Sequence, residues 1–150
     1  MEKFNHIELN NEVTKRGDNG FFKLEKDQEA IAEFLREVDY RTVKFSSEMK
    51  RLRYLVEENF YYNIFDKYIE DEIVECLELA KNFKFEFKSY MAASKFYKDY
   101  ALKTNDKKQY LENFNQHVFI VAMYLGDGNT ALAKELMIAM LEQRLQPATP

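Results

Sequence analysis

The sequence has very little of several residue types that mark special classes of protein. Its 150 residues include 1 Cys, 2 Pro and 4 Gly, and they include no Trp. A single cysteine cannot form an intramolecular disulfide, which excludes a disulfide-stapled scaffold and favours a reducing compartment. So few glycines and prolines exclude collagen-like and low-complexity chains. We therefore expect a cytoplasmic globular protein.

Long apolar runs and an excess of positive charge are also missing. The longest apolar run, residues 118–125, is too short to cross a bilayer, and the first residues show no signal-peptide pattern. The chain has 22 Lys and Arg against 26 Asp and Glu, a formal net charge of −4. Without a net positive field, neither nucleic acid nor a membrane is expected as a partner.

Hydrophobic residues, by contrast, are plentiful and arranged with the period of a helix. They make up 46 % of the chain, and a domain of this size buries roughly 68–70 % of the surface of its unfolded chain. Apolar residues recur at i, i+3 and i+4 in several segments, so the predicted fold is mainly α, an irregular bundle of about five or six helices. The predicted helices begin near Asp27, at Ser46 or Ser47, near Asp66, at Ser89, near Tyr110 and after Asn129.

Two of these helices carry more specific expectations. In the helix after Ser47, Leu52 and Leu55 mark the buried side, and Arg51 is placed largely on the opposite, polar side. The apolar run 118–125 predicts the central and most buried helix of the bundle. The sequence Gly-Asp-Gly-Asn at 126–129 is expected to end that helix and to begin the next one.

Two segments suggest extended backbone. Residues 7–24 predict a small amino-terminal β-hairpin, because strand-like pairs at 13–14 and 21–22 flank a turn-forming tetrapeptide at 17–20. Residues 83–87 alternate Phe with Lys and Glu. That alternation fits either a short strand or an extended connector held by its phenylalanines.

Residues that could carry chemistry have simpler structural interpretations. Neither His6 nor His117 has a Glu three residues before it, so the carboxylate–histidine pair of di-iron bundles is missing, and His117 is interpreted as a hydrogen-bonded packing residue. Cys76 shares a face with apolar residues and is assigned to the core. The carboxylates in 70–75 suit a solvated helix start, and no standard phosphate-binding loop occurs. From the residues alone, the chain shows no self-contained active site.

Several strings of the sequence resemble one enzyme family. They closely match the amino-terminal region of the large chain of class Ib ribonucleoside-diphosphate reductases over essentially all 150 residues. The most specific strings are 97–106 and 146–150, where unusual residues follow the family's order. The others are 7–13, 24–30, 54–57 and 143–145.

The resemblance implies a role in deoxyribonucleotide synthesis for DNA replication. In this family a catalytic barrel with the radical-forming cysteine and a redox cysteine pair follows the helical region, and Cys76 matches none of these cysteines. The implied partners are the remainder of the large chain, a small subunit that holds the radical cofactor, a dithiol reductant protein and a ribonucleoside diphosphate. The resemblance therefore implies that residues 1–150 alone are not catalytic and hold no cofactor of their own.

The resemblance also assigns roles to three residues. Thr149 corresponds to the family threonine that contacts the nucleoside diphosphate. Asp39 and Phe45 lie in what would be a shortened form of the family's adenine-nucleotide-binding cone, although Lys44 stands where relatives often have an aromatic residue. A purely structural role for that segment is the alternative interpretation.

The resemblance divides the chain into a hairpin and cone-like segment, 1–45, and a helical domain, 46–150. Three explanations for a chain of this length are considered: a piece cut at a domain boundary, a split gene product, and a stand-alone module that binds and regulates a reductase. An exposed apolar patch near residues 141–145 would favour a piece taken from a larger interface.

Overall fold

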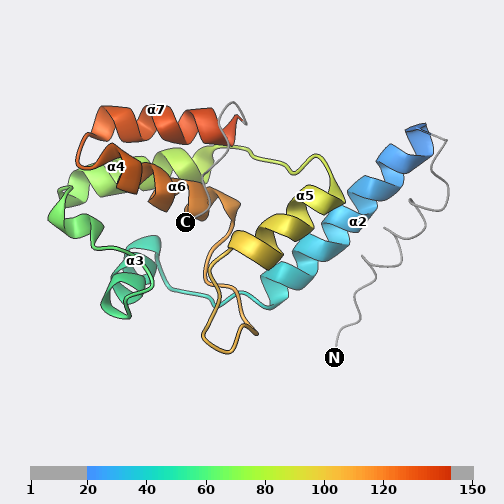
Figure 1. Ribbon diagram of the computed structural model, residues 1–150, viewed down its shortest axis with the longest axis horizontal. Helices are drawn as coiled ribbons and strands as arrows, with labels where there is room; N and C mark the ends of the chain where they lie inside the picture. The colour runs from blue at the N-terminus through green and yellow to red at the C-terminus, as the bar shows by residue number, and fades with distance from the viewer. Residues whose placement is uncertain (1–19, 143–150) are drawn as a thin grey trace. The chain divides into compact units, whose positions relative to one another are not determined.

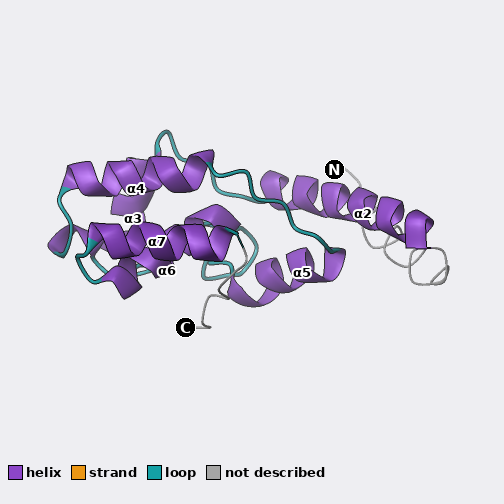
Figure 2. Ribbon diagram, turned by 90° about the horizontal axis from the view of Figure 1, so that it is seen from above, coloured by secondary structure: helices purple, strands orange, loops and turns teal. Residues whose placement is uncertain are grey.

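The computed structural model describes residues 20–142, and it describes side chains from residue 26 onward. This part of the chain is mainly α (Figures 1 and 2). Its strand-like pairing is limited to single bridges from Tyr110 to Thr42 and to Lys103. The α-helices are α2 (Gly20–Tyr40), α3 (Glu48–Glu57), α4 (Glu70–Asn82), α5 (Tyr90–Lys95), α6 (Phe114–Gly126) and α7 (Thr130–Leu141), and the shorter turns are a 3₁₀ helix (Ile64–Asp66) and a π-helical turn (Phe96–Tyr100).

The chain forms two compact units. Unit 1 comprises Met1–Thr42 and Glu86–Leu111, and unit 2 comprises Val43–Phe85 and Glu112–Pro150. No helix among the described residues is both long enough and apolar enough to span a membrane.

Helix α2 replaces part of the predicted hairpin. Residues 20–24 are helical, so the strand expected at 21–22 is wrong, while residues 7–19 lie outside the described part of the chain. Adding a turn to an existing helix gains a hydrogen bond for each residue fixed, which favours helix over an isolated strand here. Asp27 is therefore inside the helix, where its carboxylate accepts a hydrogen bond from the Tyr90 backbone N–H at 3.0 Å.

Unit 1 is built around the buried face of α2. Ala30, Ile31, Phe34 and Val38 follow the helical period and are all buried. The Phe34 ring meets that of Tyr97 edge-on at a centroid distance of 5.9 Å, and α2 and α5 lie side by side in Figures 1 and 2. Aromatic packing therefore joins two segments that are far apart in the sequence.

Unit 2 has its core among α4, α6 and α7, which contact one another pairwise. The prediction that 118–125 is a central buried helix is confirmed for most of that run, although Tyr124 and Leu125 are exposed. The turn after α6 also forms as predicted, with Asp127 in the left-handed region and the Asn129 side chain capping α7. The close packing there favours a glycine, since a Cβ at Gly126 would lie 2.8 Å from the Tyr68 hydroxyl and 3.2 Å from the Ala133 backbone nitrogen.

The segment 83–87 is a connector and not a strand. The Asn115 side-chain amide donates hydrogen bonds to the Ala80 and Phe83 carbonyls at 2.8 and 3.0 Å. The rings of Phe85 and Phe114 stack with centroids 4.0 Å apart. These contacts satisfy the end of α4 and hold the connector without a neighbouring strand, which is the second of the two alternatives that the sequence allowed.

Candidate functional site

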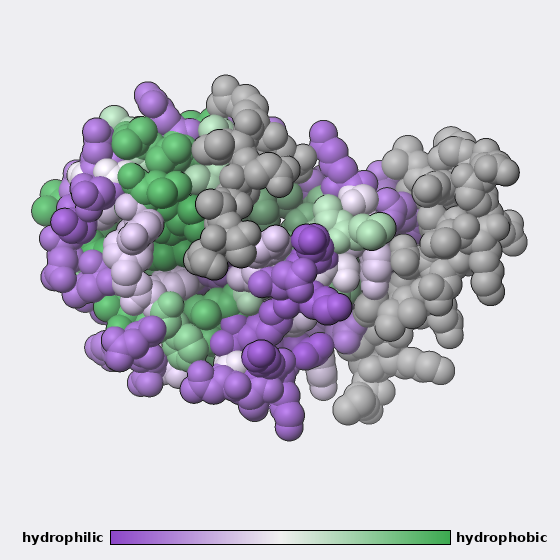
Figure 3. Space-filling view, viewed as in Figure 1, coloured by the Kyte–Doolittle hydropathy of each residue, from purple (hydrophilic) through white to green (hydrophobic). Residues whose placement is uncertain are grey.

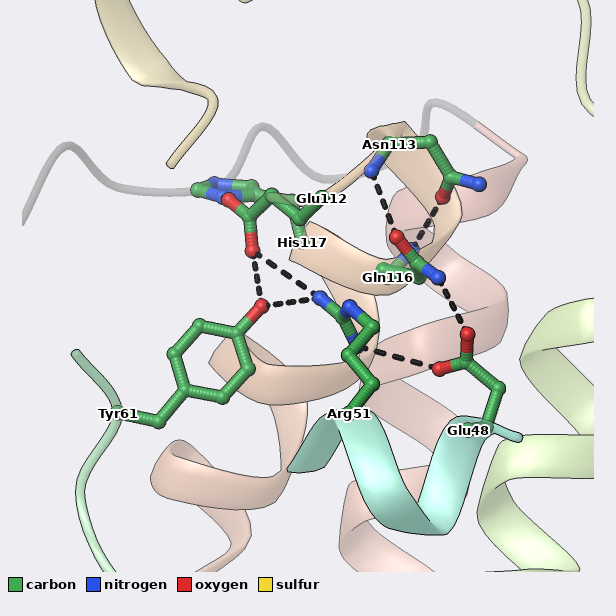
Figure 4. Close-up of polar contacts among 7 residues, drawn as sticks. All are labelled: Glu48, Arg51, Tyr61, Glu112, Asn113, Gln116 and His117. Carbon is green, nitrogen blue, oxygen red and sulfur yellow. Dashed lines mark hydrogen bonds and ion pairs between the residues drawn. The ribbon is translucent and has the colours of Figure 1, made fainter. Parts of the chain in front are cut away.

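A buried cluster of polar side chains lies where α3 meets the start of α6 in unit 2. Its central members are Arg51, Tyr61, Glu112 and His117 (Figure 4). Arg51, Glu112 and His117 are only 3 %, 2 % and 5 % exposed. Buried charged groups are costly unless they are paired and hydrogen-bonded, so their geometry is informative.

Arg51 is held on two sides by hydrogen bonds. Its Nη1 donates to Glu48 Oε2 at 3.1 Å, and its Nη2 donates to the Tyr61 hydroxyl at 2.6 Å. The same Nη2 lies 4.0 Å from Glu112 Oε2. The guanidinium therefore faces two carboxylates, one on its own helix and one at the start of α6.

Glu112 is the acceptor that joins the rest of the cluster. The Tyr61 hydroxyl donates to Glu112 Oε2, and Nδ1 of His117 lies 2.8 Å from Glu112 Oε1. Both carboxylate oxygens are thus engaged by side chains from other positions in unit 2. The prediction that His117 is a hydrogen-bonded packing histidine is confirmed by this contact and by its burial.

The chemistry of Tyr61 follows from its surroundings. Burial, together with the adjacent Glu112 carboxylate, raises the pKa of the Tyr61 hydroxyl well above its ordinary value of 10.0, although Arg51 acts in the opposite direction. The hydroxyl therefore stays protonated, accepting from Arg51 and donating to Glu112. The cluster suits a positioning role, since each of its four side chains is hydrogen-bonded to another member, and it offers no activated nucleophile.

The position assigned to Arg51 from the sequence is wrong. Arg51 stands four residues before Leu55, so the two side chains share one face of α3, and both are buried. That spacing was the available signal, but a charged residue that follows Lys50 and stands two residues before Arg53 resembles part of a solvated face. Its carboxylate partner Glu112 is 61 positions away in the sequence, and no local pattern indicates such a contact.

The other side of the cluster borders a half-open recess of about 450 Å³. It is formed by the first turn of α3, the end of α4 and the first turns of α6. Gln116 connects recess and cluster, since its Nε2 donates to Glu48 Oε1 at 2.6 Å. The lining residues are Glu48, Leu77, Ala80, Lys81, Asn113, Asn115, Gln116 and Phe119.

The residues singled out from the sequence fall elsewhere. Thr149 and His6 lie outside the described residues. Asp39 is exposed near the end of α2 in unit 1, and Phe45 is partly buried in unit 2, where its ring lies 5.5 Å from that of Tyr54. The roles assigned to Thr149, Asp39 and Phe45 stay predictions.

Cys76 occupies the core position that the sequence indicated. Its side chain is fully buried, and burial raises the pKa of its thiol. Such a thiol is a packing residue and a poor nucleophile. Within residues 20–142, no group of three or more His, Cys, Asp or Glu side chains could hold a metal ion.

Glu72, one of the carboxylates that the sequence places at a solvated helix start, lies in the first turn of α4 and forms specific hydrogen bonds. Glu72 accepts a hydrogen bond from the Ile69 backbone N–H at 3.0 Å and another from the Thr130 hydroxyl at 2.6 Å. These two bonds lower the pKa of the Glu72 carboxyl, with Thr130 as the larger cause. The residue therefore caps α4 and links it to α7.

Apolar residues also reach the surface of unit 2, where green patches interrupt the purple in Figure 3. Leu141 is only 2 % exposed, so the patch considered near 141–145 is not formed at that residue, and 143–145 lie outside the described residues. The exposed apolar residues of unit 2 include Ile69, Val74, Tyr124, Leu125 and Leu132.

Comparison with known proteins gives a consistent result along the chain. Residues 6–85 match the family model described as ribonucleotide reductase N-terminal, and residues 86–150 match ribonucleotide reductase, all-alpha domain. The chain is 42 % identical over 148 residues to ribonucleoside-diphosphate reductase NrdEB subunit alpha of Bacillus subtilis, covering 97 % of this chain and 14 % of that one.

Two further relatives show the same pattern. The identity is 42 % over 146 residues to ribonucleoside-diphosphate reductase subunit alpha of B. subtilis, covering 96 % of this chain and 21 % of the relative. It is 36 % over 147 residues to the alpha subunit of Mycoplasma pneumoniae, covering 97 % and 20 %. The chain thus spans 14–21 % of the length of these curated relatives.

The all-helical fold of the described residues and the two matched family models define a class of protein. The chain belongs to the ribonucleotide reductase family. More particularly, it corresponds to the amino-terminal region of the large, or alpha, chain, and it is of the class Ib type. The resemblance drawn from the sequence strings is therefore confirmed.

Proposed function

We propose that this chain supports the reduction of ribonucleoside diphosphates to deoxyribonucleoside diphosphates as the amino-terminal region of a reductase large chain. The observation that carries the proposal is that similarity to reductase large chains extends along nearly the whole chain. Two adjoining family models account for residues 6–150, and the relatives are similar over 96–97 % of the chain.

The role proposed for these residues is positioning and not bond-making. The carboxylates and the thiol described above are committed to hydrogen bonds or to the core, and the catalytic cysteines belong to the family's barrel. Thr149 is proposed to contact the substrate, and holding a reactant in place lowers the entropic part of a barrier. The buried cluster of Arg51, Tyr61, Glu112 and His117 supports this role, because it fixes the start of α6 to α3.

The proposed partners follow from the family. They are the remainder of the large chain, a small subunit that supplies the radical cofactor, a dithiol reductant protein and the nucleoside diphosphate substrate. A cytoplasmic location is proposed on the same basis. The division into a cone-like segment at 1–45 and a helical domain at 46–150 also remains a proposal.

A complementation assay tests the proposal. This chain would be mixed with the separately produced remainder of a matching large chain, the small subunit and a reductant, and conversion of CDP to dCDP would be followed. Activity is expected only when the chain is present. No activity, with the chain shown to be folded by circular dichroism, would contradict the proposal, and inhibition of an intact reductase would instead favour a regulatory module.

The role of Thr149 can be tested in the same assay. Removing the hydroxyl with Thr149→Ala is expected to raise KM for CDP, because one hydrogen bond to the substrate is lost. Thr149→Ser keeps the hydroxyl and is the matched control, with a KM near that of the wild type. Equal KM values for all three proteins would contradict the assignment.

Nucleotide binding through Asp39 and Phe45 is a separate proposal. A deoxyadenylate titration followed by calorimetry would test it, with Phe45→Ala expected to abolish binding if the ring stacks on the base. Phe65→Ala, which removes another partly buried ring of unit 2, is the control. Binding that survives Phe45→Ala would leave the segment with a structural role.

A further inference from the structure

The recess beside the buried cluster has the features of a small-molecule site. Its volume of about 450 Å³ falls in the range of about 300–1,000 Å³ typical of ligand pockets. Figure 4 shows Glu48, Asn113 and Gln116 on the side of the cluster away from Tyr61 and His117. Leu77 and Phe119 give the recess an apolar wall.

Hydrogen bonds within the chain determine which side-chain atoms of Asn113 and Asn115 remain free to bind a ligand. Asn113 Oδ1 accepts from the Gln116 backbone N–H at 2.9 Å, so its Nδ2 group is left as a donor. Asn115 Nδ2 donates to the Ala80 and Phe83 carbonyls, so its Oδ1 is left as an acceptor. Because backbone N–H groups need acceptors and carbonyls need donors, neither amide can be reversed.

The charges around the recess are nearly balanced. Lys81 is exposed and forms no ion pair with the described residues. The Glu48 carboxylate is already bound by Arg51 and Gln116. Among the lining residues, the solvent-exposed Lys81 ammonium alone is left for an anionic ligand, whereas an uncharged polar ligand finds a free donor in Asn113 and a free acceptor in Asn115.

We propose that this recess binds a flat, uncharged molecule with a lactam edge, such as a nucleobase of the uracil or hypoxanthine type. The ring N–H of the lactam donates to Asn115 Oδ1, and its carbonyl accepts from Asn113 Nδ2. The ring lies against Leu77 and Phe119. The inference rests on residues 48–119 alone and does not depend on the proposed reductase function.

Titration with nucleosides tests the proposal, because nucleosides have no phosphate and so cannot engage a phosphate site. Uridine and inosine carry a ring N–H next to a carbonyl, whereas cytidine and adenosine lack that N–H. Binding to the chain would be measured by calorimetry and by amide chemical shifts. We expect uridine and inosine to bind about tenfold more tightly than cytidine and adenosine, the effect of about one buried hydrogen bond.

Two matched variants locate the binding. Asn113→Asp keeps the oxygen that caps α6 but removes the Nδ2 donor, so it should weaken uridine binding about tenfold without unfolding the chain. Asn129→Asp makes the same change at the cap of α7, away from the recess, and should leave binding unchanged. Circular dichroism confirms that both variants are folded.

Three outcomes would overturn the proposal. The first is absence of binding by uridine and inosine up to the limit of their solubility. The second is equal binding of all four nucleosides, which would indicate non-specific stacking. The third is equal weakening by Asn113→Asp and Asn129→Asp, which would separate the binding from the recess.

Discussion

Nδ1 of His117 lies 2.8 Å from Oε1 of Glu112, five residues earlier in the chain, and both side chains are buried. This contact spans the beginning of α6, where Asn113 caps the helix. The other oxygen of Glu112 accepts from Tyr61, whose hydroxyl in turn accepts from Arg51. One buried carboxylate therefore joins α3, the loop after it and α6.

Removing the Tyr61 hydroxyl tests how much these hydrogen bonds contribute to the free energy of unfolding. Tyr61→Phe leaves Glu112 and Arg51 each with one hydrogen bond fewer in a buried place, and we expect a loss of about 1–3 kcal/mol in the free energy of unfolding. Urea denaturation measures it. Tyr124→Phe removes a hydroxyl from a residue that is 62 % exposed and is the control, with little expected change. Equal effects of the two variants would contradict the assignment.

Removing the charge of Arg51 should have a larger effect. Arg51→Met leaves Glu112 without its guanidinium, and we expect a loss of about 3–5 kcal/mol, as for other broken buried pairs. The double variant Arg51→Met/Glu112→Met should recover part of this loss, because no uncompensated charge then remains.

The control for charge removal is Arg53→Met on the same helix. Arg53 is 53 % exposed and lies 3.9 Å from Glu70, so its ion pair is worth about 0–1 kcal/mol. Strictly additive losses in the double variant at Arg51 and Glu112 would show that the two residues are not energetically coupled.

The lowered pKa of Glu72 predicts a pH dependence of stability. The folded protein holds this carboxyl deprotonated at a pH where the unfolded chain, with an ordinary value of 4.5, already binds a proton. Stabilisation by Glu72 is therefore fully present above the pKa of the unfolded chain, 4.5, and is lost as the pH falls through the lower pKa of the folded protein. Melting temperatures measured from pH 7 to pH 3 should fall less steeply for Glu72→Gln than for the wild type.

A neighbouring carboxylate gives the control for Glu72. Glu78 is exposed on the same helix and forms no hydrogen bond with the described residues. Glu78→Gln should therefore leave the slope of melting temperature against pH close to that of the wild type. A Glu72→Gln slope that matches the wild type as well would contradict the linkage to Thr130 and Ile69.

The burial of Cys76 predicts slow thiol chemistry. Its side chain is 0 % exposed and its pKa is raised, chiefly by burial, so little thiolate is present near neutral pH. A thiol-specific reagent such as DTNB should react slowly with the native protein and rapidly in denaturant. Fast reaction of the native protein would show that the core around α4 opens readily.

Local sequence patterns determined much of the fold. Ser47, Ser89 and Asn129 each cap a helix with a side-chain oxygen, and the caps are readable because they precede apolar residues at helical spacing. The core positions of Cys76 and His117 followed from the same periodicity. Family membership was also evident from the sequence, since it depends on the order of unusual residues and not on geometry.

Only the tertiary structure decided which polar residues meet. Arg51 and Glu112 are far apart in the chain, and burial of Arg51 depends on a carboxylate that another segment delivers. The same holds for the recess, whose walls come from α3, α4 and α6. Helical periodicity is a local property of consecutive residues, whereas pairing of buried charges depends on how separate helices pack, and that is why the sequence alone placed Arg51 on the wrong face.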